Sequence, residues 1–193
     1  MASAPAVSSV LAIMDSRSKN SGVIDTDGLD LSARYRFDTS FGTLTAGADA
    51  TYVMHYKTAP VPTATIVEQV NNFTYPLKWR ARFNFGWQKG GWSALAYVNY
   101  SNPYNIPRSQ LPPTSPDQYL SIASYTTVDL TLRYDTGDGE GAFRNIALTL
   151  NATNLFDKDP PLVLNLGTTP VRFDPQNASP LGRVVSAQIT KRW

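Results

Sequence analysis

Apolar and polar residues alternate one by one along much of this chain. Between positions 43 and 56 every even position is apolar, and the odd positions are polar or small except for Val53. A period of two places successive side chains on opposite faces of a β-strand, whereas a helix needs a spacing of three to four residues. This segment is therefore predicted to be a strand with one apolar face.

The same period recurs along the rest of the chain. Apolar residues occupy every second position in seven segments, at 29–37, 41–56, 77–87, 92–100, 127–134, 146–153 and 181–193. Repeated strands of this kind, separated by turn residues, are typical of all-β proteins. The pattern predicts about seven antiparallel strands that follow one another as an up-and-down meander.

The connections between these strands alternate in length. The connections at 38–42, 88–91 and 135–141 are short, whereas 57–75, 101–122 and 157–180 are long and rich in Pro, Asn, Ser and Thr. Short turns at one end and long loops at the other are typical of outer-membrane barrels, in which the turns face the periplasm and the loops face outside. The fold predicted here is a segment of an antiparallel transmembrane β-barrel.

Aromatic residues gather at the two ends of the predicted strands. One group is expected near the short turns and comprises Phe37, Phe41, Trp87, Trp92, Tyr134, Phe143 and Trp193. The other group is expected near the long loops and comprises Tyr52, Tyr56, Tyr75, Tyr100 and Phe156. Membrane barrels carry two such girdles at the headgroup levels, although aromatic pairs also form across strands in any sheet.

Composition separates a membrane barrel from a soluble sandwich or lipocalin. A soluble sheet would carry many charges on its outer face, but charged residues make up only 17% of this chain, against about 25% in typical proteins. No apolar run approaches the roughly 18 residues of a spanning helix. The loop asymmetry and the girdles favour strands whose apolar sides face lipid.

Few residues suit catalysis, cofactors or nucleic acid. The chain has no cysteine and one histidine, His55, without a nearby base and orienting partner, so we expect neither an enzyme nor a bound cofactor or metal. The glycines at 137, 139 and 141 lack a following helix and are better explained by a hairpin turn. A net charge of +2 is too small and dispersed to predict binding of nucleic acid.

Basic residues do gather on the predicted polar face. Because the arginine guanidinium matches carboxylate geometry, they could hold an internal plug or guide anionic cargo, and a solvated channel wall is the alternative. These lumen-facing or plug-facing candidates are Arg34, Arg36, Lys78, Arg80, Arg82, Arg133 and Arg183.

The segment Asn154-Leu155-Phe156-Asp157, followed by Lys-Asp-Pro-Pro, resembles the penultimate-strand motif of TonB-dependent receptors. The run Gly-Leu-Asp-Leu-Ser-Ala-Arg-Tyr at 28–35 is similar to a strand repeated in that family, and Gly-Arg at 182–183 opens a final strand. The last strand also resembles the family's assembly signal, which the barrel-assembly machinery reads. Its residues are Val185, Ala187, Ile189 and Trp193.

The resemblance implies a 22-stranded barrel with a plugged lumen in the bacterial outer membrane. Such receptors import iron–siderophores, cobalamin or saccharides with energy relayed by the TonB–ExbB–ExbD system through the plug. Residues 21–193 would form the C-terminal part of the barrel, residues 1–20 an extracellular loop or partial strand, and no plug domain is expected in the chain. Its partners would be outer-membrane lipid and the remainder of the barrel and plug.

Seven strands leave two edges whose backbone groups lipid cannot satisfy. We therefore expect an incomplete barrel, and the alternative is a small self-contained or oligomeric porin-like barrel without a plug. In a receptor, the long loops would form part of the outer ligand vestibule, since binding residues concentrate on loops. The candidate ligand-binding residues there are Tyr104, Arg108, Tyr119 and Arg172.

Overall fold

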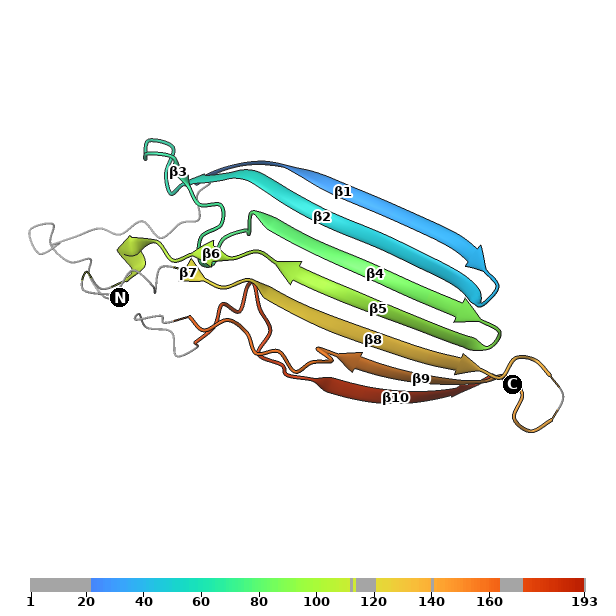
Figure 1. The fold of residues 1–193 in the computed structure, drawn as a ribbon. Coiled ribbons are helices and arrows are strands. Elements are labelled where there is room, and N and C mark those ends of the chain that lie inside the picture. The colour runs from blue at the N-terminus through green and yellow to red at the C-terminus, as the bar shows by residue number, and fades with distance from the viewer. Residues whose placement is uncertain (1–21, 112, 114–120, 140, 164–171, 193) are drawn as a thin grey trace, which may run out of the picture.

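The computed structural model describes residues 22–111, 113, 121–139, 141–163 and 172–192, in which the long strands form one open antiparallel sheet, and β6 (Tyr104–Asn105) and β7 (Ser121–Ile122) form a separate small one (Figure 1). The order of its long strands follows their order in the chain, so each pairs with its sequence neighbours. The strands are β1 (Val23–Thr39), β2 (Gly42–Ala59), β4 (Trp79–Lys89), β5 (Trp92–Ser101), β8 (Tyr125–Asp135), β9 (Ile146–Thr153) and β10 (Val184–Lys191). This confirms the predicted all-β meander and its open, incomplete-barrel form.

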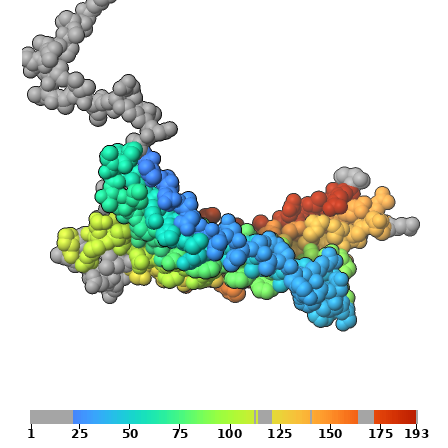
Figure 2. Space-filling model, turned by 90° about the horizontal axis from the view of Figure 1, so that it is seen from above, coloured from blue at the N-terminus to red at the C-terminus, as the bar shows by residue number. Residues whose placement is uncertain are grey.

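The sheet is twisted and has two free edges. β1 and β10 each pair on one side only among the described residues, so the sheet does not close on itself. Figure 2, which looks down on the β1 edge, shows β1 running across the front at an angle to β9 and β10 behind it. Such a twist follows from the right-handed twist of each strand.

Three short strands lie in the long connections, where the alternation predicted none. They are β3 (Val67–Glu68), β6 (Tyr104–Asn105) and β7 (Ser121–Ile122), and a 3₁₀ helix, η2, covers Arg108–Gln110. All three gather at the loop end of the sheet, opposite the short turns (Figure 1). Within the described part of the chain, no helix is both long enough and apolar enough to cross a membrane.

The strand register joins the apolar positions of all seven strands into continuous rows. One row across the middle of the sheet reads Tyr35, Ala46, Phe85, Ala96, Leu130, Ala152 and Val185. The next row on the opposite face reads Arg36, Thr45, Gly86, Leu95, Thr131, Asn151 and Ser186. Large side chains alternate with alanines along the apolar row, so the two faces differ sharply in polarity.

Nothing in the described chain covers the apolar face. Its side chains remain exposed to a degree that is unusual for residues of their size, with Leu31 57%, Phe85 54% and Ile189 74% exposed. Contiguous apolar surface of this extent marks contact with a membrane or with another protein. The sheet therefore has no core of its own on this side.

Aromatic rings pair at both ends of the strands. Trp92 and Tyr134 lie with ring centroids 4.5 Å apart beside the short turns, and Tyr52 and Trp79 lie 4.7 Å apart near the loops. Contacts of this geometry contribute about 0.5–1.5 kcal/mol beyond the area they bury. Trp79 was not among the aromatics assigned to the girdles from the sequence.

A bulge explains the break in alternation at Val53. The register between β1 and β2 steps from Asp27–His55 to Gly28–Val53, which leaves Met54 without a partner. A side chain at position 28 would approach the Tyr52 carbonyl oxygen to 2.5 Å, so glycine fits the close backbone contact at this bulge. Beyond the bulge, the odd positions of β2 share the face of the odd positions of β1.

Candidate functional site

The buried core of the described chain lies in the long loops and not in the sheet. Its members come from all three long connections, so the loops pack on one another instead of extending separately. The core consists of Leu77, Tyr104, Ile106, Leu111, Ile122 and Val163, with Phe73 packed against it. We call residues 71–77, 102–111, 121–122, 163 and 172–180 the loop cluster.

A single carboxylate, Asp174, ties the loop cluster together. This residue is only 1% exposed. Its oxygens accept hydrogen bonds from the backbone N–H of Gln176 at 3.0 Å, the Asn177 side-chain amide at 2.7 Å and the Thr74 N–H at 3.4 Å. The Tyr104 hydroxyl is a further partner. A buried charge is tolerated only when it is hydrogen-bonded in this way.

The environment of Tyr104 follows from this arrangement. Burial of the phenol raises its pKa well above the ordinary value, and the charge of Asp174 and the hydrogen bond to it raise the pKa further. Tyr104 therefore remains a neutral donor to the carboxylate. Since it is 3% exposed, its place in the structure is inside the cluster.

The loop cluster reaches down onto the polar face of the sheet at Arg80. The Asn177 side-chain oxygen and the Gln176 carbonyl oxygen, at 3.4 Å, both accept from Nη2 of Arg80. Asn177 thus connects Asp174 to a strand residue through two hydrogen bonds. This contact holds the 172–180 segment against the wall of the sheet.

Three hollows meet at Arg80. The first has a volume of about 410 Å³ and lies between the strand residues Asn99, Ser101 and Thr127 and the segment 175–180. The second, about 320 Å³, extends toward Val53, and the third, about 310 Å³, extends toward Arg82. These volumes lie at the lower end of the range for small-molecule sites, about 300–1,000 Å³.

The other predicted polar-face arginines are mostly engaged with neighbours. Nη1 of Arg34 lies 3.0 Å from an Asp49 carboxylate oxygen, and Nη2 of Arg133 lies 2.7 Å from Asp135. Arg36 makes a longer contact of 3.9 Å with Asp38. These pairs are at least one-third exposed, so each contributes little to stability by itself.

Arg82 and Arg183 have different surroundings. The Arg82 guanidinium lies 3.9 Å from the centroid of the Tyr97 ring, a cation–π contact on the polar face. Arg183 precedes β10, and its backbone N–H donates to Asp157 at 2.7 Å.

Lys78 departs from the predicted orientation. Its ammonium lies 5.7 Å from the ring centroid of Tyr52, which belongs to the apolar face. Leu77, expected on that apolar face, is instead 3% exposed inside the loop cluster. The reason is that β4 begins only at Trp79, opposite the bulge in β2, so the alternation expected for residues 77–78 does not apply.

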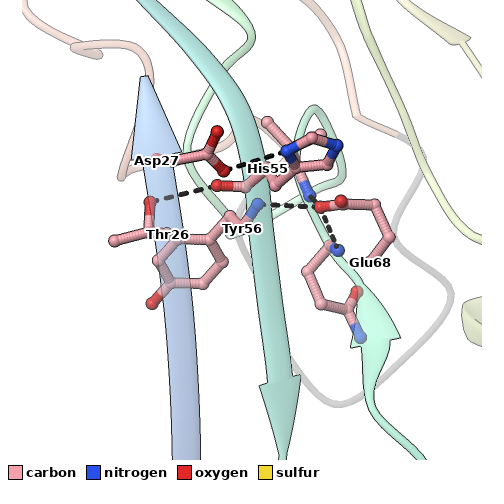
Figure 3. Close-up of polar contacts among 7 residues, drawn as sticks. Thr26, Asp27, His55, Tyr56 and Glu68 are labelled. Atoms are coloured by element: carbon pink, nitrogen blue, oxygen red, sulfur yellow. Dashed lines mark hydrogen bonds and ion pairs between the residues drawn. The ribbon is translucent and has the colours of Figure 1, made fainter. Parts of the chain in front are cut away.

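A polar network joins β1, β2 and β3 above the bulge (Figure 3). His55 Nδ1 lies 2.9 Å from an Asp27 carboxylate oxygen, and the Thr26 hydroxyl donates to the His55 carbonyl. Glu68 accepts from the backbone N–H groups of Tyr56, Gln69 and Val70. Partial desolvation acts to raise the pKa of Glu68, but these three donors and the nearby His55 lower it overall. The hydrogen bond from β2 to the Glu68 carboxylate is thus present at neutral pH, and it is lost as the pH falls through that lowered pKa.

The Asn-Leu-Phe-Asp segment forms the turn that ends β9. Asn154 has a positive φ of 50°, its side chain exchanges two hydrogen bonds with the Lys158 backbone, and its own N–H donates to Asp129 at 2.9 Å. The Leu155 N–H donates to the Val128 carbonyl, while Phe156 is 73% exposed. The motif therefore shapes the chain between β9 and β10.

Asp157 fixes the approach to the last strand at Gly182. A side chain at position 182 would lie 2.6 Å from the Asp157 carboxylate oxygen that accepts from the Arg183 N–H. We expect Gly182→Ala to destabilise the assembled protein by about 0.5–1.5 kcal/mol, because the carboxylate must move away and its hydrogen bond with the Arg183 N–H is lost. Urea unfolding in lipid vesicles measures this.

A double-mutant cycle provides the control for Gly182→Ala. In an Asp157→Ala background the clash is absent, so adding Gly182→Ala should cost much less than it does alone. Equal costs in both backgrounds would show that the close contact at 182 is unimportant.

The predicted assembly-signal residues lie on one face of β10. Val185, Ala187 and Ile189 are exposed and pair with the apolar positions of β9. Lys191 turns toward the short-turn end, where its ammonium donates to the carbonyls of Ala142 and Arg144. Trp193 lies outside the described residues.

The structure separates the predicted ligand-binding residues. Tyr104 is buried in the loop cluster, whereas Arg108 is exposed on η2 and donates to the Pro113 carbonyl at 3.4 Å. Arg172 is exposed, and its carbonyl accepts from Val163. Tyr119 lies outside the described residues. No group of three or more His, Cys, Asp or Glu side chains that could hold a metal ion occurs in the described segments.

Sequence reasoning missed Asp174 and Asn177, which organise this end of the molecule. A local signal existed in Asp-Pro-Gln-Asn, because Asp side chains bond the backbone two residues on, as Asp174 bonds Gln176 here. That signal predicts a turn. It does not predict the contacts with Thr74 and Arg80, which are about a hundred residues away in the chain.

An open antiparallel meander with one uncovered apolar face, paired aromatics at both ends and packed long loops defines part of a membrane β-barrel. The model of the family described as TonB dependent receptor-like, beta-barrel, matches residues 3–155. The chain belongs to this family, whose members are receptors and transporters of the bacterial outer membrane and not enzymes. The match includes only the first two residues of the Asn-Leu-Phe-Asp motif. Neither a curated protein nor a solved structure matches the chain.

Proposed function

We propose that this chain forms part of the barrel wall of an outer-membrane receptor that takes up scarce ligands through the TonB–ExbB–ExbD system. The observation that carries the proposal is the pairing of an uncovered apolar face with a polar face onto which the loop cluster folds. The first suits lipid, and the second suits a space through which a ligand passes. Iron–siderophores, cobalamin and saccharides are the proposed cargo classes.

The two free edges support an assembly larger than the described sheet. β1 and β10 expose unpaired backbone groups, and each such group costs several kcal/mol in hydrocarbon. We propose that further strands of the receptor pair with both edges and that a plug domain occupies the polar side. Barrel-assembly machinery would recognise the β10 end.

Within the proposed receptor, the exposed loop residues Arg108 and Arg172, together with Tyr119, are proposed to contact the ligand. Tyr104 would act on these loops indirectly, since its hydroxyl binds Asp174 inside the loop cluster. The polar-face arginines are proposed to face the plug or the ligand path.

Uptake by intact cells tests the proposal. Cells that carry the receptor containing this chain, and matched cells lacking it, are given labelled ferric siderophores, cobalamin and oligosaccharides in turn. We expect energy-dependent uptake of one class that disappears in the deletion and when the proton gradient is collapsed. Uptake that survives loss of the gradient would instead identify a passive pore.

A further inference from the structure

Arg80 and Arg82 lie on the polar face without a direct ion pair, although Asp49 lies opposite Arg82 in the strand register and interacts with its charge. None of the ion pairs between described residues includes either side chain. Arg80 meets only the neutral oxygens of Asn177 and Gln176, and Arg82 lies over Tyr97. The same hollow of about 310 Å³ is therefore lined by two positive charges and by one carboxylate, that of Asp49.

The nearest acidic groups are already occupied. Asp49 pairs with Arg82 in the strand register, but its carboxylate is bound by Arg34 at 3.0 Å and by the Ser32 hydroxyl at 2.8 Å. Asp174 is buried and saturated by donors, with Asn177 between it and Arg80. Neither is free to serve as the counter-ion of Arg80.

Donors remain available around the two guanidinium groups. Both hydrogen bonds of Arg80 use Nη2, which leaves the rest of its planar fork open. The Ser101 hydroxyl lines the same hollow and makes no hydrogen bond to another described residue. A guanidinium fork with a neighbouring hydroxyl matches the two oxygens of a carboxylate or phosphate.

The position of Arg80 is fixed before any ligand arrives. The chain of contacts from Tyr104 through Asp174 and Asn177 holds the guanidinium at the point where the three hollows meet. Such pre-organisation reduces the entropic cost of binding. The hollows have the size of a small-molecule site, whereas a protein partner would need a broader surface.

We propose that Arg80, Arg82 and Ser101 form a binding subsite for an anionic oxygen group, a carboxylate or phosphate, of a small ligand. The inference rests on the proposed function, because it places the subsite on the path of the imported ligand. It selects acidic ligands over neutral saccharides among the proposed cargo.

Protection of arginines from phenylglyoxal, read by peptide mass spectrometry, tests the subsite directly. The sample is outer-membrane fragments holding the receptor that contains this chain, with citrate, inorganic phosphate or neutral sorbitol as probes. We expect citrate or phosphate, at about ten times its dissociation constant, to slow labelling of Arg80 and Arg82 about tenfold, because only the unoccupied sites react. Labelling of Arg36, at the other end of the same face, should not change.

The two anions distinguish the ligand chemistries, because protection by citrate alone indicates a carboxylate and protection by phosphate alone a phosphate group. Equal labelling with all three probes would overturn the proposal, as would a uniform slowing of every arginine. If Arg80 is unreactive without any probe, a protein domain such as a plug covers it, which also rules out the small-ligand subsite.

Two variants extend the test. The protection measured on the unaltered chain does not depend on whether these variants fold. Arg80→Gln should abolish the protection of Arg82, whereas Arg36→Gln should leave it intact. Protection at Arg80 without uptake of any ligand class would overturn the proposed function but keep the subsite. Uptake of a ligand while Arg80 stays unprotected would overturn the subsite but keep the proposed function.

Discussion

Leu130→Arg is expected to destabilise the assembled receptor by about 2–4 kcal/mol, the cost of a cationic side chain near the middle of a bilayer on the lipid side of a barrel. Leu130 lies in the central row of the apolar face, between Ala96 and Ala152. The measurement is the free energy of unfolding in urea, with the receptor folded in vesicles of outer-membrane-like lipid.

The chain offers a closely matched control for this substitution. Leu95 is also a leucine in the middle of a neighbouring strand, but it lies on the polar face, between Gly86 and Thr131. Leu95→Arg should change the free energy of unfolding by less than about 1 kcal/mol, because its guanidinium stays in water. A larger cost at position 95 would show that the faces are assigned the wrong way round, and equal costs would show that the apolar face is not the one in contact with lipid.

Asp174→Ala should release the loop cluster. The substitution leaves the Tyr104 hydroxyl, the Asn177 amide and the Gln176 N–H without their shared acceptor in a buried place. Hydrogen bonds to a charged group contribute about 1.5–3 kcal/mol each, so we expect a local loss on the order of 3 kcal/mol. Hydrogen–deuterium exchange should rise in peptides from residues 71–77, 102–111 and 172–180.

The control for Asp174→Ala is Asp159→Ala in the same long connection. Asp159 is exposed and shares no hydrogen bond with the loop cluster, so exchange there should not change. Exchange in β4, β5 and β8 should remain slow in both variants. If Asp174→Ala leaves the three loop peptides as protected as before, the loops are held by their apolar core alone.

The strands could be predicted from the sequence because alternation is a local property of each segment. A row such as Ala96, Leu130 and Ala152 arises because period-two strands, joined by short turns, come into register. The Asn154 and Asp157 motif was identified by resemblance. Its role as a turn that holds Gly182 and Arg183 required the coordinates.

The failures share a physical cause, which is that the deciding contacts are distant in sequence. In the sequence, Leu77 and Lys78 continue the alternation of β4. In the structure, the bulge at Met54 in the neighbouring strand β2 interrupts that alternation. Asp174 meets Thr74 after a hundred intervening residues. No periodic signal encodes such a contact, so the sequence placed Arg80 on the polar face but did not predict the loop cluster or its contact with Arg80.

The unequal strand lengths have a consequence for the height of the barrel wall. β1 and β2 have 17 and 18 residues, whereas about 9–11 residues suffice to cross a bilayer. The part of the hairpin beyond the bulge, with five residue pairs from Val23–Ala59 to Asp27–His55, corresponds to roughly 17 Å of extended chain. In the proposed receptor, this end of the β1–β2 hairpin extends above the lipid headgroups. The His55 network then lies among the surface sugars and not in the bilayer.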